Sequence, residues 1–509
     1  MKLFRNKYFL LFLIVALAVV LRLIAIDGRS LWGDEVDSVF KAHDFESSGY
    51  KYVRSDPLKV IDYPIKTTFE DGRQTPLYFI LLSIWIDLLG PSSLAMRSLS
   101  VMLGVLAVVL AFLFASEFFD TDVSLLAALF FAFSPFNVLY SQEIRVYALL
   151  AMVSIISTWS LMKLLFKEET NASYLCYVLS SIVLTYVHFY GVLFIASQII
   201  VGLLIYWLNR SPSHIIRILY AQAFVIIAFL PWAVFGAVKN AGLVLSGEAV
   251  LPYALYNFAV RGGLYIFALF LGESIAPWNY IAGLGAFVGL ILFIKFIIEN
   301  GRSLNSKEIA CFLMVIVPVL LSLLLKNTLP KYLITCSAVL MIFAAFTVMK
   351  FRNVFFRASI ILLILLAYCV SLNNYYHLRE MHNSNLMEPW SEITSEIAAN
   401  YRPGDRVFVN DQYVAFREME YYLNIIHGES INIDLVERGL SGERIFLVLS
   451  IYDENQKSNI KEKFMRSGYW LVSRSDYVPY DKTLAAKLPR RLHRLGQSRV
   501  EVYLYSRKG

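Results

Sequence analysis

The chain has 509 residues, of which 58% are hydrophobic and only 17% are charged, and its formal net charge is +7. This composition excludes a large water-soluble enzyme. The 37 Phe, 31 Tyr and 8 Trp residues also exclude a disordered chain, because they supply more apolar surface than a solvated chain tolerates. The small basic excess fits the cytoplasmic loops of a membrane protein and gives no reason to expect a nucleic-acid partner. The sequence therefore predicts a polytopic membrane protein.

Apolar runs predict about 11 transmembrane helices, since about 20 apolar residues are needed for one helical crossing of the bilayer. The predicted spans are 8–26, 94–116, 123–140, 145–166, 173–188, 190–208, 215–238, 280–298, 308–325, 331–349 and 357–372. The fifth and sixth spans are separated only by the region from His188 to Gly191, so they are either two short helices or one broken helix. This choice decides on which side of the membrane every later loop lies.

The distribution of basic residues predicts the orientation, because Lys and Arg in short loops stay on the cytoplasmic side. With a cytoplasmic N-terminus, the inner set is Lys2, Arg5, Lys7, Lys163, Lys167, Arg210, Arg217, Arg302, Lys307, Lys350, Arg352 and Arg357. The short outer loops hold only Arg145, Lys326 and Lys331. The bias predicts a cytoplasmic N-terminus, long outer loops at 27–93 and 239–279, and an extracytoplasmic C-terminal tail in the cell membrane.

The composition changes after residue 373, where charged residues return. Short apolar runs typical of strands alternate there with helical stretches. The expected strands are 406–409 and 444–449, and the expected helices are 388–400, 413–424 and 455–467. The sequence thus predicts a membrane domain at 1–372 followed by a small α/β domain at 388–509. The second domain has no clustered catalytic residues, so we expect it to dock the acceptor or to shield the site.

Two groups of charged residues are candidates for chemistry. Asp34 and Glu35 follow the first span, and adjacent carboxylates that repel each other are typical of a base, a ligand or a partner for a cation. A solvated acidic loop has the same pattern. Gln142, Glu143 and Arg145 lie between the third and fourth spans, where ionisable residues are costly and usually functional. A Glu–Arg pair that joins two helices is the alternative there.

Further polar residues lie toward the same predicted outer face. Tyr78 follows Pro76 and Leu77, Arg97 opens the second span, and Arg22 lies near the end of the first. His188 and Lys331 occupy later outer connections. An alternative for Arg22 and Arg97 is that their side chains extend to the membrane interface only to solvate their charge. An alternative for His188 is an interfacial residue with satisfied hydrogen bonds. These residues are candidates because the predicted topology places all of them toward the same face of the membrane.

At these residues the chain resembles the polytopic GT-C glycosyltransferases, the group of protein O-mannosyltransferases and the lipid A aminoarabinose transferase. The matching motifs are Arg22, Leu31-Trp32-x-Asp34-Glu35, Pro76-Leu77-Tyr78, Arg97, Ser134-Pro135, Tyr140-Ser141-Gln142-Glu143-x-Arg145-x-Tyr147, His188-Phe189-Tyr190, Lys331-Tyr332, Glu388-Pro389-Trp390 and Pro403-Gly404-Asp405. Two positions depart from the family. Gln74 replaces a frequent His, and Lys331 replaces an Arg, which keeps the positive charge but loses the bidentate fork.

The resemblance implies a GT-C-like helical bundle that moves a hexose or pentose from a polyprenyl-phosphate donor to an acceptor hydroxyl on the outer face. The acceptor is a protein, a lipid or a polysaccharide. Asp34 is the expected catalytic base and Glu35 its catalytic neighbour, while Arg97, Arg145 and Lys331 are expected to bind phosphate. Tyr78, Glu143 and His188 are further expected substrate contacts.

A single displacement predicts inversion at the anomeric carbon. No metal-ligand cluster is evident, so we expect no metal and no other cofactor, with a divalent ion left open. The four cysteines lie in apolar runs, and we expect no disulfide. The alternative classes are a transporter and a catalytically silent lipid-binding protein. Transporters usually place their ionisable groups near the bilayer midplane, whereas these gather at one face.

Overall fold

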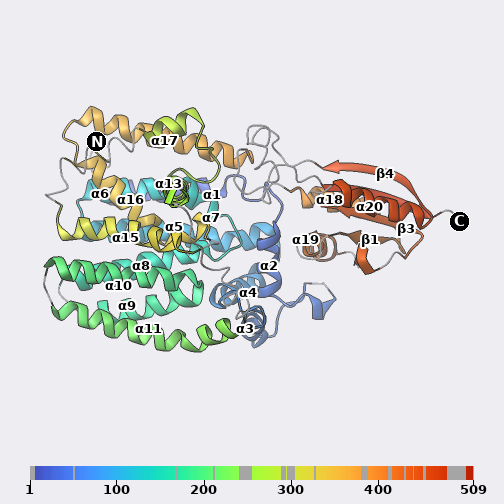
Figure 1. Cartoon of the computed structure of the whole chain (residues 1–509), viewed down its shortest axis with the longest axis horizontal. Helices are drawn as coiled ribbons and strands as arrows, with labels where there is room; N and C mark the ends of the chain where they lie inside the picture. The colour runs from blue at the N-terminus through green and yellow to red at the C-terminus, as the bar shows by residue number, and fades with distance from the viewer. Residues whose placement is uncertain are drawn as a thin grey trace. The chain divides into compact units, whose positions relative to one another are not determined.

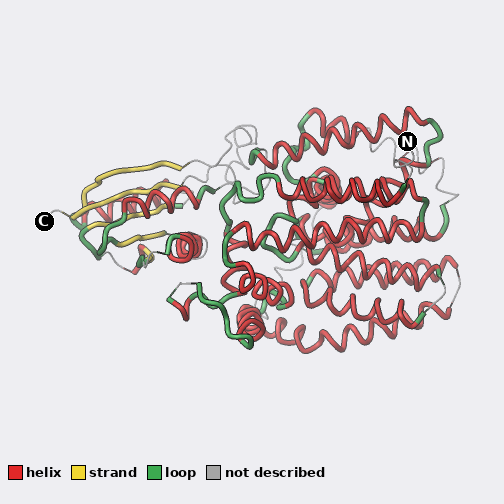
Figure 2. The backbone as a smooth tube through the Cα atoms, turned by 180° about the vertical axis from the view of Figure 1, so that it is seen from behind, coloured by secondary structure: helices red, strands yellow, loops and turns green. Residues whose placement is uncertain are grey.

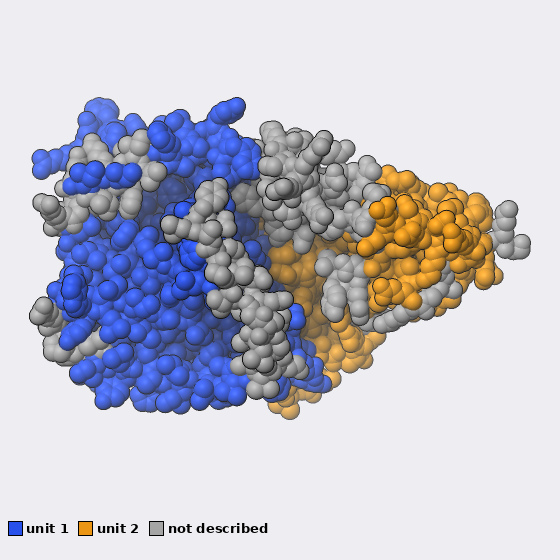
Figure 3. Space-filling view, viewed as in Figure 1, with its two compact units in different colours: residues 1–24, 64–81, 97–372 blue, residues 25–63, 82–96, 373–509 orange. Residues whose placement is uncertain are grey.

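The computed structural model describes residues 6–49, 52–167, 170–209, 212–239, 255–287, 294, 298, 304–325, 328–379, 388–410, 415–428, 431–438, 441–450, 454–477 and 500–507. The chain forms two compact units, coloured separately in Figure 3. The first unit contains residues 1–24, 64–81 and 97–372, and the second contains 25–63, 82–96 and 373–509. Much of the predicted outer loop at 27–93 therefore groups with the C-terminal residues.

The first unit is built mainly from apolar helices, most of which lie side by side in both backbone views (Figures 1 and 2). They are α1 (Lys7–Leu23), α5 (Ser93–Phe118), α6 (Thr121–Phe133), α7 (Pro135–Tyr140), α8 (Tyr147–Phe166), α9 (Asn171–Val187), α10 (Tyr190–Asn209), α11 (Pro212–Lys239), α13 (Leu255–Leu271), α15 (Ser306–Leu323), α16 (Ser337–Met349) and α17 (Val354–Tyr376). α5 and α17 contribute residues to both units. The predicted helical membrane bundle is confirmed.

Seven of the described helices are long and apolar enough to cross a membrane. They are Ser93–Phe118, Tyr147–Phe166, Tyr190–Asn209, Ile216–Gly236, Ser306–Leu323, Pro330–Met349 and Val354–Tyr376. Of the predicted span at 280–298, residues 288–293 and 295–297 lie outside the described residues. The count of about 11 crossings stays a prediction.

Two predicted spans are not single continuous α-helices. The span at 123–140 divides into α6 and α7, because Pro135 cannot continue a helix but fits its first turn. The Ser134 side chain accepts the Asn137 N–H at 3.4 Å and caps α7. The span at 331–349 begins as a 3-10 helix, η4 (Pro330–Cys336), before α16 starts. Both interruptions bring polar residues to helix ends.

The fifth and sixth predicted spans are two separate helices, α9 and α10. His188 has an extended backbone, with φ −163° and ψ 143°, and its ring Nδ1 accepts the Tyr190 N–H at 3.0 Å. A Cβ atom at Gly191 would lie 2.4 Å from the Leu184 carbonyl oxygen, so only glycine allows this close approach. These local features explain why the apolar run breaks at this point.

The predicted outer loops contain helices that the apolar pattern did not separate. Within 27–93 lie α2 (Gly33–Ala42), α3 (Lys59–Asp71), α4 (Leu77–Leu89) and a short 3-10 helix, η2 (Glu46–Ser48). α13 lies within the predicted loop at 239–279. α4 and α13 are apolar but only 13 and 17 residues long. The apolar run of α4 is short, and that of α13 is interrupted by Arg261, Gly262 and Gly263.

The C-terminal part of the second unit is a five-stranded mixed sheet with the order β2-β1-β3-β5-β4. The strands are β1 (Arg406–Val409), β2 (Ile433–Leu435), β3 (Arg444–Leu449), β4 (Tyr469–Tyr477) and β5 (Val500–Arg507). The helices are α18 (Trp390–Asn400), α19 (Ala415–Met419), η6 (Glu420–Ile426), which is a π-helix, η7 (Val436–Arg438), which is 3-10, and α20 (Glu454–Arg466). The predicted small α/β domain is confirmed, with strands β1 and β3 at the expected residues.

Alternation along β3 explains how the sheet packs. Ile445, Leu447 and Leu449 share one face of the strand and join a buried cluster with Phe464 of α20. Strands β1, β2 and β3 are parallel, whereas β5 and β4 are antiparallel to their neighbours. The domain thus has an apolar core of its own.

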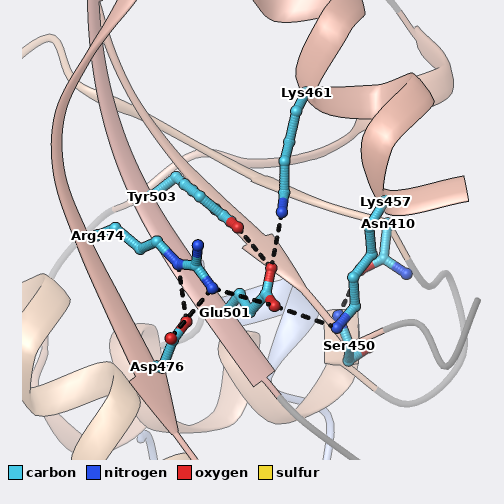
Figure 4. A network of polar contacts seen from close by, with 8 residues as sticks. All are labelled: Asn410, Ser450, Lys457, Lys461, Arg474, Asp476, Glu501 and Tyr503. Carbon is cyan, nitrogen blue, oxygen red and sulfur yellow. Dashed lines mark hydrogen bonds and ion pairs between the residues drawn. The ribbon is translucent and has the colours of Figure 1, made fainter. Parts of the chain in front are cut away.

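A charged network surrounds Glu501 at one end of this sheet (Figure 4). The Glu501 carboxylate lies 3.4 Å from the Lys457 Nζ and 3.0 Å from the Lys461 Nζ, and the Tyr503 hydroxyl donates to it. Burial alone would raise the pKa of the Glu501 carboxyl, but the hydrogen bonds from Tyr503 and Lys461 and the charge of Lys457 lower it to about 2. The network links α20 to β5.

Candidate functional site

An aromatic cluster in the first unit brings together residues from three parts of the chain. Tyr147 opens α8, Tyr332 lies in η4, and His188 and Tyr190 form the α9–α10 junction. The Tyr190 and Tyr332 rings stack with centroids 4.2 Å apart, and the His188 ring lies 5.3 Å from Tyr332 and 6.3 Å from Tyr147. The break between α9 and α10 at His188 and the start of η4 at Pro330 bring residues of these segments to the cluster.

Two cations lie close to the Tyr147 ring. The Lys331 Nζ lies 5.4 Å from the centre of this ring, and the Arg145 guanidinium carbon lies 6.0 Å from it. Lys331 is also 5.9 Å from the Tyr332 ring. Stacking against aromatic faces stabilises each cation. Two like charges on one ring form a positive site that suits a phosphate group.

A third cation lies close to the same rings. Arg261 of α13 donates to the Tyr265 hydroxyl at 2.8 Å and to Thr328 Oγ1 at 2.9 Å, and its charge acts on the Tyr190 hydroxyl. The sequence analysis missed Arg261. A lone Arg inside an apolar run was the available signal. Arg261 falls within the predicted outer loop at 239–279, where a charged residue is not unusual.

Two carboxylates lie around Tyr140 of α7. The Tyr140 hydroxyl donates to Glu273, and both Glu143 and Glu273 act on it electrostatically. Glu273 also interacts with the charge of Lys331. Gly272, with φ +90°, lets the chain approach α7, since a Cβ there would lie 2.8 Å from the Pro135 Cβ. Glu273 was also missed by sequence analysis, because no motif surrounds it.

Gln142 connects this region to the end of α1. Its buried side-chain amide donates to the Arg22 carbonyl at 2.7 Å and to the Ile24 carbonyl at 2.9 Å. Carbonyls at a helix C-terminus have no partner within the helix, so the amide satisfies groups that would otherwise be costly to bury. The Arg22 side chain is itself fully buried and donates to the Ala132 carbonyl at 3.0 Å. Arg22 therefore joins α1 to α6 rather than extending to the interface.

Tyr78 and Arg97 occupy other positions in the first unit. Both are fully buried. The Tyr78 hydroxyl lies 3.4 Å from the Ser100 hydroxyl of α5, and its ring packs edge-on against Phe79. The structure thus brings Glu143, Arg145, His188 and Lys331 to one cluster, and Tyr78 contacts Ser100 of α5 and Phe79 of α4.

Asp34 and Glu35 begin α2 in the second unit and have different surroundings. Glu35 is fully buried, accepts the Trp32 N–H at 3.4 Å and lies 3.9 Å from the Arg29 guanidinium. These contacts cap α2 and hold the preceding turn. Asp34 is half-buried in the first turn, and its backbone carbonyl accepts the Ser38 hydroxyl at 2.8 Å. Glu35 therefore supports the helix start, and Asp34 is the better candidate for a proton acceptor.

The side chains gathered in the first unit are mainly cationic and aromatic. In the described ranges, no group of three or more His, Cys, Asp or Glu side chains could hold a metal ion. The first unit offers two cations on one tyrosine ring and nearby carboxylates. Such a set can bind a phosphate together with a polar group that carries hydroxyls.

Comparisons with known proteins show which family and which folds the chain is similar to. Residues 73–235 match the family described as dolichyl-phosphate-mannose-protein mannosyltransferase. The chain is similar to the crystal structure of ArnT from Cupriavidus metallidurans bound to undecaprenyl phosphate, with a TM-score of 0.61, 12% identity, and coverage of 96% of this chain and 97% of that one. No curated protein sequence matches the chain.

A second group of similar structures is an oligosaccharyltransferase from Archaeoglobus fulgidus. The structure tethered to an acceptor peptide has a TM-score of 0.50 and 12% identity, and covers 94% of this chain and 70% of that one. The structure with an inhibitory peptide and a dolichol-phosphate has the same TM-score and 12% identity, and covers 84% and 64%. The chain shares its overall fold with these solved structures. The resemblance to the GT-C superfamily that the motifs indicated is confirmed.

Proposed function

We propose that the protein transfers a sugar from a polyprenyl-phosphate donor to an acceptor hydroxyl on the extracytoplasmic side of the membrane. The observation that carries the proposal is the position of Lys331 and Arg145 on the Tyr147 ring, in a fold shared with a transferase structure that holds undecaprenyl phosphate. Paired cations stabilise the phosphate both in the donor and as a leaving group. The tyrosine rings supply flat apolar faces for a sugar.

The proposed reaction is one displacement. Asp34 takes the proton from the acceptor hydroxyl, the acceptor oxygen bonds to the anomeric carbon, and the bond from that carbon to the phosphate oxygen breaks. Polyprenyl phosphate departs with the electron pair as a stable anion, so a strong general acid is unnecessary. Attack opposite the leaving group inverts the anomeric centre. Glu35 supports the start of α2 and, through it, Asp34.

The experiment uses purified full-length protein and a panel of polyprenyl-phosphate hexoses and pentoses, with an envelope extract as the acceptor. Release of polyprenyl phosphate, measured by mass spectrometry, reports transfer whichever acceptor is used. Asp34→Asn should lower turnover by about two to four orders of magnitude while undecaprenyl phosphate still binds.

Asp37→Asn is the matched control for this substitution. Asp37 lies one turn further along α2, where it pairs with Lys41 at 2.7 Å, and its replacement should leave turnover close to that of the wild type. Near-normal turnover of stable Asp34→Asn protein would overturn the assignment of the base. Sugar uptake into vesicles without covalent transfer would instead indicate a transporter.

A further inference from the structure

The segment that leads into Asp34 is held by the C-terminal part of the chain within the second unit. The Leu31 N–H donates to the Tyr422 hydroxyl at 2.7 Å, and the Ser391 N–H donates to the Ser30 hydroxyl at 2.9 Å. Leu31 and Tyr422 are both buried. Because water cannot replace a partner at a buried N–H, the Tyr422 hydroxyl fixes the backbone three residues before Asp34.

Tyr422 lies in the π-helix η6. In this helix the His427 N–H donates to the Tyr422 carbonyl at 3.0 Å, five residues earlier, which is the π-helical hydrogen bond. The adjacent Tyr421 and Tyr422 rings meet edge-to-face at 4.9 Å. Tyr421 donates to the Pro91 carbonyl at 2.9 Å, whereas Tyr422 accepts from Leu31. Two neighbouring tyrosines therefore hold two different segments.

A second contact holds the far end of α2. Arg417 of α19 donates to the Glu46 carboxylate at 2.9 Å, just beyond the helix. Its guanidinium carbon also lies 4.6 Å from the centre of the Phe40 ring, on α2 itself. The C-terminal part of the chain thus contacts the segment that carries Asp34 both before and after that residue.

We propose that the C-terminal α/β domain positions Asp34 for the reaction and that Tyr422 is the positioning residue. This inference rests on the proposed function, in which Asp34 is the base. It assigns the domain a part in catalysis that differs from acceptor docking or shielding. The Tyr422 hydroxyl acts through the Leu31 backbone, and a small displacement there moves the Asp34 carboxylate away from the acceptor proton.

Tyr422→Phe tests the proposal, because it removes the acceptor oxygen and keeps the ring. Tyr421→Phe is the matched control, since it removes one tyrosine hydroxyl from the preceding residue of the same helix. We expect Tyr422→Phe to lower kcat by about tenfold or more, with the KM for the donor unchanged. Tyr421→Phe should keep kcat near that of the wild type.

Hydrogen exchange gives a readout that does not depend on activity. Peptides spanning residues 31–38 should exchange faster in Tyr422→Phe than in Tyr421→Phe, because the Leu31 N–H loses its acceptor. Undecaprenyl phosphate, used as the binding probe, should bind both variants as it binds the wild type.

The outcomes separate this inference from the proposed function when Asp34→Asn is measured in the same assay. If Asp34→Asn is inactive and Tyr422→Phe turns over like Tyr421→Phe, the positioning role is wrong while the function stands. Unchanged exchange in residues 31–38 of Tyr422→Phe would also overturn the positioning role. If Asp34→Asn retains turnover, the proposed base fails and the positioning role fails with it.

Discussion

Replacing Gln142 with alanine should damage both stability and turnover. The side-chain amide makes two buried hydrogen bonds, to the Arg22 and Ile24 carbonyls, at the point where α1 ends. Each such bond contributes about 0.5 to 1.5 kcal/mol net, so losing both should lower the free energy of unfolding by about 1 to 3 kcal/mol. Because Gln142 directly precedes Glu143 in the chain, losing these two bonds should also displace the Glu143 carboxylate and the Arg145 guanidinium.

Gln198→Ala provides the comparison. Gln198 is also a fully buried glutamine, and it bonds Ser157 at 3.0 Å and Tyr177 at 3.3 Å between helices of the first unit. Both variants should unfold at lower temperature in detergent, followed by intrinsic fluorescence. Only Gln142→Ala should also lose turnover, by about tenfold or more, in the polyprenyl-phosphate release assay. If the two variants were equally destabilised and equally active, Gln142 would be only a packing residue and this reasoning would fail.

Three further outcomes are expected. Lys331→Ala should weaken undecaprenyl phosphate binding about tenfold in a titration, whereas Lys331→Arg should retain binding, because arginine keeps the charge and adds a fork of donors; equal binding by Lys331→Ala would exclude the phosphate role. Ionised Glu501, with its pKa lowered to about 2 from an ordinary 4.5, stabilises the α/β domain above pH 4.5, and this contribution is lost as the pH falls toward 2. Glu501→Gln should therefore speed hydrogen exchange in β5 at pH 7 and show a smaller further increase on acidification than the wild type. Reporters fused after Arg217 should read cytoplasmic and those after Asn373 external, and a cytoplasmic signal from the latter would reverse the predicted orientation.

The sequence by itself determined that this is a polytopic membrane protein, because apolar composition and the length of apolar runs decide directly whether a segment can cross a bilayer. It also located strands β1 and β3 and the charged segments around Asp34 and Glu143. It did not separate α6 from α7, because the helix break at Pro135 leaves the average hydropathy almost unchanged. It did not detect α13, because Arg261, Gly262 and Gly263 interrupt the apolar run of that helix.

Only the tertiary structure decided which residues act together. Arg261 and Glu273 carry no local motif, and their relation to the tyrosine cluster depends on contacts between segments far apart in the chain. Glu35 and Asp34 are adjacent in sequence, yet one is buried against Arg29 and the other is half-buried, because successive residues of a helix point about 100° apart. The support that Tyr422 gives to Leu31 joins residues 391 positions apart, a pairing that no sequence period encodes.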